Sequence, residues 1–247
     1  AGALSDTDPT YNRPLSGTPP AGLSAVGTAV SYDSFQFYVD AAGSYRVFVP
    51  GLRKNTSGTS WAAGAEAGSS LSLRDFYVAK PSDSARRINM ELARGKHLLL
   101  TPGVYHLDRA LQVNRRNTVV LGLGMPSLVA ETGDAALRVG DVDGVRVAGV
   151  LVDAGARASD TLVEIGDRHS RSDHSRNPVS LQDVFLRVGG PTAGKARTTL
   201  VVNSDDTILD HIWAWRADHG NGVAWTVNTA DYGVVVNGDD VTAYGLF

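Results

Sequence analysis

Short apolar runs recur along the C-terminal part of the chain, and corners rich in Gly, Asn, Asp and Ser separate them. Five of these runs align with one another, beginning at Thr118, Val145, Val179, Thr207 and Val241. Their starts lie 27, 34, 28 and 34 residues apart. Short apolar runs bounded by turn residues are typical of buried strands. Their recurrence at this spacing predicts a solenoid in which each repeat forms one coil.

One corner of this solenoid is copied almost letter for letter. Residues 202–207 are VNSDDT, and 34 residues later residues 236–241 are VNGDDV. An immunoglobulin-like sandwich would have a shorter spacing between its strands and no copied corner. The pattern therefore predicts an all-β fold, a right-handed parallel β-helix of the single-stranded, pectin-lyase-like kind.

The N-terminal part of the chain lacks this repeat. Residues 1–30 are rich in Pro, Gly, Ser and Thr, which predicts an extended segment. Residues 35–49 alternate with the period of two that is typical of a half-buried hairpin. Residues 51–70 are loop-like, with Trp61 as a packing residue. We therefore expect residues 1–72 to form an extended segment followed by a β-hairpin.

Residues 82–94 carry the one helix that the sequence predicts convincingly. Ser82 or Ser84 can cap its first turn, and Gly95 can end it in a left-handed conformation. A short helix before a run of strands suits the end-cap of a solenoid, whose first coil would otherwise expose unpaired backbone. The β-helix is accordingly expected to span residues 73–247.

Charge and composition argue against several classes of function. The net charge is -3, from 23 basic and 26 acidic residues, and there is no basic stripe that would attract nucleic acid. No apolar run reaches the roughly 18 residues of a membrane span. The chain has no Cys, and we expect the polar loop 168–178, with His169 and His174, to be solvated rather than to bind a metal. No cofactor, nucleic acid or membrane is therefore expected as a partner.

The densest group of functional-looking side chains lies between the two copied corners, and nothing in the other aligned runs matches it. Trp213 and Trp215 are two residues apart, so a strand would place both on one face. An exposed indole offers a flat apolar platform to a sugar ring, and a nearby carboxylate can accept hydrogen bonds from its hydroxyls. Alternatively, one indole fills the interior of the coil. Trp215, Asp218 and His219 are the predicted substrate-binding residues. The whole group comprises Trp213, Trp215, Arg216, Asp218, His219 and Trp225.

Asp218 is the candidate catalytic residue. Together with Asp239 and Asp240 it resembles the three-aspartate pattern of polygalacturonase-type glycosidases, in which two carboxylates across a cleft act as acid and base. The adjacent pair, however, is the copy of residues 205–206, and Asp is favoured at corners by backbone geometry. A feature repeated in each coil is better explained by architecture than by catalysis.

Several strings of the chain together resemble the C-terminal β-helix of glycoside hydrolase family 55, the secreted bacterial and fungal β-1,3-glucanases, or laminarinases. The likeness runs from about residue 38 to residue 247 and is closest from residue 96 onward. The matching strings are KHLLLTPGVYHLD at 96–108, NTVVLGLG at 117–124, GDVDGVRVAGVLVDAG at 140–155, NPVSLQDVFLRVGG at 177–190 and the whole of 210–247.

The resemblance implies a secreted enzyme with two side-by-side β-helices and a pocket between them, which residues 1–72 would connect. It also implies exo-type, inverting cleavage of β-1,3-glucan by a glutamate general acid and a water nucleophile. Asp218 then matches an acidic residue of the subsite that binds the non-reducing glucose. Trp215 matches an aromatic contact with the sugar.

In the family, the general-acid glutamate lies about one coil beyond the string Gly-Leu-Phe, which here occupies residues 245–247. The resemblance therefore implies a truncated β-helix that carries part of the sugar-binding wall and is inactive alone. Its expected partners are β-1,3-glucan and the missing N-terminal β-helix and C-terminal segment of the same enzyme. A non-catalytic polysaccharide-binding β-helix and a polygalacturonase-like hydrolase are the alternatives.

Overall fold

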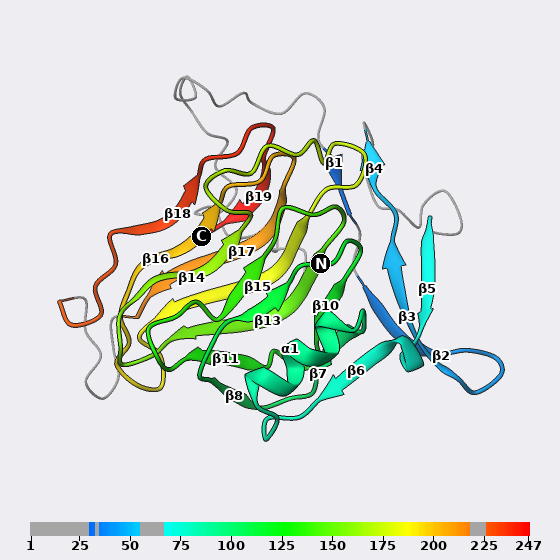
Figure 1. Cartoon of the computed structure of the whole chain (residues 1–247), viewed down its shortest axis with the longest axis horizontal. Coiled ribbons are helices and arrows are strands. Elements are labelled where there is room, and N and C mark those ends of the chain that lie inside the picture. Colours follow the sequence, from blue (N-terminus) through cyan, green and yellow to red (C-terminus); the bar gives the residue numbers. More distant parts are fainter. Residues whose placement is uncertain (1–29, 33–34, 55–66, 218–225) are drawn as a thin grey trace, which may run out of the picture.

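The structure is a computed structural model that describes residues 30–32, 35–54, 67–217 and 226–247. Its main body is the predicted parallel β-helix, in which strands of successive coils stack side by side (Figure 1). A small antiparallel sheet lies beside this body, on the right in Figure 1. No helix within the described ranges is long and apolar enough to cross a membrane.

Three faces make up the β-helix, and within each face the strands of neighbouring coils pair in parallel. The first face holds β6 (Phe76–Ala79), β7 (His97–Leu100), β10 (Val119–Gly122), the first halves of β13 (Arg146–Ala154), β15 (Ser180–Val188) and β17 (Ile208–Arg216), and β19 (Thr242–Leu246). The second face holds β8 (Val104–Leu107), β11 (Ser127–Ala130) and the second halves of the three long strands. The third face holds β9 (Leu111–Val113), β12 (Leu137–Val139), β14 (Ser159–Ile165), β16 (Ala196–Val202) and β18 (Tyr232–Val236).

The five aligned runs of the sequence lie directly beside one another on the first face. Val119, Arg146, Ser180, Ile208 and Thr242 pair in succession, and each is the second residue of its run. Each run therefore occupies the same place in its coil. The predicted solenoid, with one coil per repeat, is confirmed.

A bend divides each long strand between the first and second faces. Gly149, Asp183, His211 and Gly245 occupy equivalent positions at this bend, with φ values of 68°, 51°, 55° and 53°. This left-handed conformation is uncommon for residues other than Gly. Because this conformation recurs in four successive coils, β13, β15, β17 and β19 turn at the same corner.

Rows of apolar side chains fill the interior of the β-helix. On the third face, Leu111, Leu137, Val163 and Leu200 follow one another from coil to coil, and none of them is exposed. Burying one such side chain contributes about 1.5–3 kcal/mol. The stacked rows form one continuous core cluster along the described coils.

Helix α1 (Ala85–Ala93) covers the N-terminal end of the interior, where Ile88 and Leu92 enter the core (Figure 1). It starts three residues later than predicted, because Ser84 is its N-cap and the Ser84 side chain accepts one of the free N–H groups of the first turn, from Arg87. Gly95 ends it with a φ of 93°, as predicted. A short 3-10 turn, Leu73–Asp75, precedes β6.

The antiparallel sheet consists of β2 (Gln36–Val39), β3 (Tyr45–Pro50) and β5 (Gly68–Ser72). The predicted hairpin is confirmed by β2 and β3. The prediction of loop over residues 51–70 is wrong for the residues of β5, which pair with β3 although they are mostly Gly and Ser. Trp61 lies outside the described residues. The assignment of residues 1–72 to a connection between two domains stays a prediction.

This sheet covers part of the first face. Val47 and Val49 of β3 pack in one buried cluster with Leu99 and Val119 of the β-helix. A second, shorter pair of strands, β1 (Val30–Ser31) and β4 (Arg53–Lys54), continues along the same face. The first face is therefore largely occupied by the N-terminal part of the chain.

The side chain of Asn89 joins α1 to β9, the edge strand of the third face. Its Nδ2 donates to Ala110 O at 2.9 Å, and its Oδ1 accepts from Gln112 N at 2.8 Å. The amide thus supplies the pairing that a neighbouring strand would otherwise provide. We predict that Asn89→Ala lowers the free energy of unfolding by about 1–3 kcal/mol, because it leaves both backbone groups without this partner. Urea denaturation would measure the loss.

Arg86→Ala, at an exposed position of the same helix, serves as the control and should change the stability little. Equal losses in the two variants would show that the edge of β9 does not depend on this amide.

Candidate functional site

Aromatic side chains form a row on the outside of the second face, in the last described coils. Phe185, Trp213 and Phe247 occupy equivalent positions of successive coils. The ring centroids are 5.5 Å apart between the first two and 5.7 Å apart between the last two. Trp213 is 40% exposed and Phe247 is 37% exposed. The row is therefore an aromatic surface that faces solvent.

Trp215 stands in the neighbouring row of the same face and is 37% exposed. Its counterpart in the preceding coil is Arg187, which binds both carboxylate oxygens of Asp153 at 2.7 and 2.8 Å. Both tryptophans therefore lie on one outer face, as predicted, and neither fills the interior of the coil. Trp215, Arg187 and Asp153 thus occupy equivalent positions of successive coils. Their indole, guanidinium and carboxylate groups form a second row beside the aromatic one.

A histidine and an aspartate that the sequence analysis did not single out complete this surface. His211 Nδ1 lies 2.5 Å from Asp183 Oδ1, and both residues occupy the left-handed corner positions. The imidazole ring meets Phe185 edge-on at 5.2 Å and Phe247 at 6.1 Å between centroids. In the sequence, each of the two residues comes two positions before an aromatic residue of the row. This shared offset is the signal by which the sequence could have pointed to them.

Asp218, His219 and Trp225 lie outside the described residues, so their predicted roles stay predictions. The chain that leads to Asp218 is held firmly, since Ala217 is buried and its N–H donates to Val188 O at 3.1 Å.

The aspartates of the copied corners have structural roles. Asp206 and Asp240 both adopt left-handed backbone, with φ of 56° and 55°. The Asp239 N–H donates to Asp205 Oδ1 at 2.8 Å, and the Asp206 N–H donates to Asp239 O at 2.9 Å. These two contacts link the first copied corner to the second. They support the architectural interpretation of the Asp239–Asp240 pair over a polygalacturonase-like triad.

The loop 168–178 is exposed at most of its positions, as predicted, but His174 is only 1% exposed, so the prediction of a solvated segment is wrong for this residue. Its Nε2 lies 2.9 Å from Asp141 Oδ1 and its Nδ1 lies 2.9 Å from Asp143 Oδ1. Its backbone N–H donates to Asp206 Oδ2 at 2.9 Å. The imidazole is thus clamped between two carboxylates and fastens the loop to the corners of neighbouring coils. Within the described part of the chain, no His, Cys, Asp and Glu residues gather in a way that could hold a metal ion.

The clamp changes the pKa values of His174 and Asp141. Burial opposes the charged form of His174, but the hydrogen bonds to Asp141 and Asp143 outweigh it and raise the pKa of the imidazole. Burial also works against ionisation of Asp141, yet hydrogen bonds from His174, Ser172 and Ser204 lower its pKa to about 2. Both shifts favour the ionised forms, the imidazolium of His174 and the carboxylate of Asp141.

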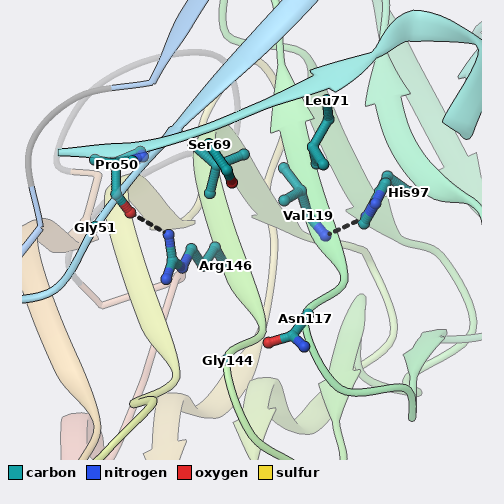
Figure 2. A pocket seen from close by; sticks show the side chains of 11 residues that line it. Pro50, Gly51, Ser69, Leu71, His97, Asn117, Val119, Gly144 and Arg146 are labelled. Atoms are coloured by element: carbon teal, nitrogen blue, oxygen red, sulfur yellow. Dashed lines mark hydrogen bonds between the residues drawn. The ribbon is translucent and has the colours of Figure 1, made fainter. Parts of the chain in front are cut away.

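A pocket of about 390 Å³ lies where the N-terminal sheet meets the first face (Figure 2). Figure 2 shows the Arg146 side chain donating to Pro50 O and His97 Nδ1 accepting from Val119 N. Burial lowers the pKa of His97, in keeping with an imidazole that accepts this bond in its neutral form. Arg146 also lies over the Tyr32 ring, 4.0 Å from its centroid. These polar groups serve the joint between the two parts, so the pocket is not the candidate site.

Comparisons with known proteins place this arrangement in a family. Residues 76–247 match the family model of the LAM55 pectate lyase-like domain. The chain is 56% identical over 220 residues to an exo-beta-1,3-glucanase of Streptomyces sp. (strain SirexAA-E / ActE), and the match covers 89% of this chain and 36% of that relative. The chain belongs to glycoside hydrolase family 55. The matched residues include all three faces of the β-helix, whereas the N-terminal sheet precedes them.

Two solved structures of this family have the same fold. The structure of sacteLam55A from Streptomyces sp. SirexAA-E is 55% identical, has a TM-score of 0.85, and matches over 88% of this chain and 40% of that chain. A variant of sacteLam55A in complex with glucose matches with the same identity and TM-score, over 88% of this chain and 39% of that chain. This chain thus spans well under half the length of the relatives it matches.

We predict that the contribution of His174 to stability depends on pH. Because the pKa of the imidazole is raised on folding, its contribution is complete below the unfolded value near 6.5 and is lost as the pH rises through the folded value. At the acidic end, the contribution of Asp141 is lost as the pH falls from about 4 towards its folded value of about 2. His174→Gln should therefore cost about 3 kcal/mol near pH 5, since it breaks a buried ion pair, and less at pH 9.

Urea denaturation of both proteins across this range would give the difference directly. His169→Gln, at the exposed histidine of the same loop, is the control and should show no such pH dependence. A cost for His174→Gln that stays constant from pH 5 to pH 9 would contradict an imidazolium in the clamp.

Proposed function

We propose that this chain forms part of the glucan-binding wall of a β-1,3-glucanase that cleaves laminarin-type glucan with inversion. The observation that carries the proposal is the exposed surface of Trp213, Trp215 and Phe247 on the second face. Support comes from the 56% identity to a protein named as an exo-beta-1,3-glucanase. We also propose that the enzyme is secreted, as the resemblance to the family implies.

Stacking on flat indoles is the physical basis of the proposed binding. The apolar face of a glucose ring can lie on Trp213 or Trp215, while its hydroxyls exchange hydrogen bonds with charged groups at the edge of the surface. Arg187 and Asp183 provide such groups in the described coils, and Asp218 is proposed to provide another. The wall binds the substrate and holds its ring in place for the reaction.

Inverting hydrolysis also needs a proton donor and a base, on carboxyl groups about 6.5–9.5 Å apart. Of the carboxylates beside the aromatic row, Asp153 is paired with Arg187 and Asp183 with His211. Burial raises the pKa of Asp210, but its side chain belongs to the first face. We therefore assign the general acid to a glutamate outside this chain, as the family resemblance implies, and propose that the chain alone is inactive.

The last described coil supports a further coil as a partner. Val236 and Leu246 correspond to Val202 and Ile212, which fill the interior of the preceding coil and are buried. The later pair is nevertheless 48% and 46% exposed. Apolar positions of a solenoid interior are normally covered by the next repeat. A coil stacked on this end would cover both side chains and could carry the proton donor.

A non-catalytic polysaccharide-binding β-helix is the second candidate, because the same wall without a proton donor would bind glucan and release nothing. Reducing-sugar release separates the two functions. The chain alone should release none from laminarin or from polygalacturonate, whereas the enzyme that contains it should release sugar from laminarin only. Release from laminarin by the chain alone would contradict the assignment of the proton donor. Release from polygalacturonate would favour the three-aspartate alternative.

Binding depends on the wall and not on the corners, according to this proposal. We predict that Trp215→Ala and Asp218→Ala each weaken the binding of laminari-oligosaccharides about tenfold or more, since each removes a contact with the sugar. Asp205→Ala, which alters only a corner contact, should leave the binding nearly unchanged. Calorimetric titration measures all three. Equal effects of Asp218→Ala and Asp205→Ala would contradict the distinction between site and corner.

A further inference from the structure

A groove of about 530 Å³ crosses the third face, away from the aromatic row. Its floor lies on β14, β16 and β18, where Thr161, Thr198 and Tyr232 are paired neighbours on successive coils. Two consecutive residues of β14, Leu162 and Val163, both enter the core cluster. The residues on either side of them, Thr161 and Glu164, line the groove.

The walls of the groove are held in place by contacts already described. Arg168 and Arg171 come from the loop that His174 clamps, and the Arg171 N–H also donates to Asp141 Oδ2 at 3.3 Å. The opposite wall carries Arg197. A groove with a fixed floor and a fastened wall is largely pre-formed, as ligand sites usually are.

The charges that line the groove nearly balance. Three arginines face two acids, Asp160 and Glu164, which leaves a formal charge of +1. Glu164 is paired with Arg138 at 3.2 Å, and Arg197 with Asp231 at 3.3 Å. A site for a polyanion would instead carry a clear excess of unpaired positive charge. The lining favours a neutral ligand that is rich in hydrogen-bonding groups.

Tyr232 gives the groove an aromatic surface, since it is 54% exposed at one end of the floor. The hydroxyls of Thr161 and Thr198 and the exposed amide of Asn237, which is linked to Asn203 at 2.8 Å, can each donate and accept. A flat ring beside groups that both donate and accept matches the apolar face and the hydroxyl edge of a sugar ring.

We propose that this groove is a second carbohydrate site, which binds a short stretch of neutral β-glucan separately from the second face. The choice of β-glucan as the ligand rests on the proposed function. A polysaccharide held on the third face would stay near the aromatic surface of the second face, because the two sites belong to one rigid β-helix. Such a linkage raises the effective concentration of the substrate at the second site.

The test is native affinity electrophoresis of the full chain in gels that contain laminarin. Tyr232→Ala should weaken the retardation, with an apparent dissociation constant about tenfold higher. The matched control is Tyr45→Ala, because Tyr45 is also 54% exposed but lies on β3 of the N-terminal sheet. Wild-type retardation of Tyr232→Ala would overturn the proposal.

Arg197→Ala, at an exposed position of β16 on the opposite wall, tests the groove without a substitution in the edge strand β18. It should weaken laminarin binding in the same direction as Tyr232→Ala, with thermal unfolding unchanged from the wild type. Loss of binding only in variants with a lowered melting temperature would overturn the proposal. If the groove variants lost binding to polygalacturonate but kept binding to laminarin, the proposal of a site for neutral glucan would also be overturned.

Trp215→Ala separates this proposal from the proposed function. If both sites hold one laminarin chain at the same time, the losses of binding free energy in Tyr232→Ala and Trp215→Ala add in the double variant. If only Trp215→Ala weakens binding, the groove is excluded and the second face stands. If only Tyr232→Ala weakens binding, the groove stands and the wall proposed on the second face is wrong.

Discussion

Parallel strands that pair in register place each residue about 4.8 Å from its counterpart in the next coil. Every position of the coil therefore becomes a row that runs along the β-helix. Inside, the rows are apolar and close-packed. Outside, one row becomes the stack of Phe185, Trp213 and Phe247, and at a corner another becomes the pair Asn203 and Asn237. The candidate binding surfaces are consequences of this register, because a slip of one residue would turn their side chains inward.

The corners hold this register in place. Left-handed residues recur at the bend between the first two faces, and again at Asp206 and Asp240 before the strands of the first face. His174 adds a charged clamp, which ties a long loop to Asp141 and Asp143. The carboxylates of four corner residues are thus engaged with backbone groups or with the imidazole, namely Asp141, Asp143, Asp205 and Asp206. Catalytic groups would need to be free to exchange protons with a substrate.

The three faces have different surroundings, and this difference directs the functional argument. The first face is covered by the N-terminal sheet and by Tyr32, which lies over Arg146 (Figure 1). The second face is open and aromatic. The third is open, polar and hollowed. A single repeating fold therefore offers two distinct exposed surfaces, because the residues at equivalent outward positions differ from coil to coil while the interior stays uniform.

Local patterns were enough to predict the coils, the hairpin at 35–49 and the helix, because period and turn residues report directly on backbone conformation. They also placed Trp213 and Trp215 on one face, since the alternation of a strand is strictly local. They could not find β5, whose Gly and Ser residues become a strand only by pairing with β3.

The contacts between distant coils were likewise beyond the sequence pattern. His174 meets carboxylates 31 and 33 residues away, and Asp183 meets His211 across 28 residues. Which side chains become partners depends on how many residues lie in the corners and loops between the strands. Only the folded structure shows which residues form the strands and which positions of neighbouring coils lie opposite one another. A periodic sequence therefore specifies what each coil is made of, while the stacking of the coils decides which side chains meet, because side-chain interactions act across the few ångströms between neighbouring strands.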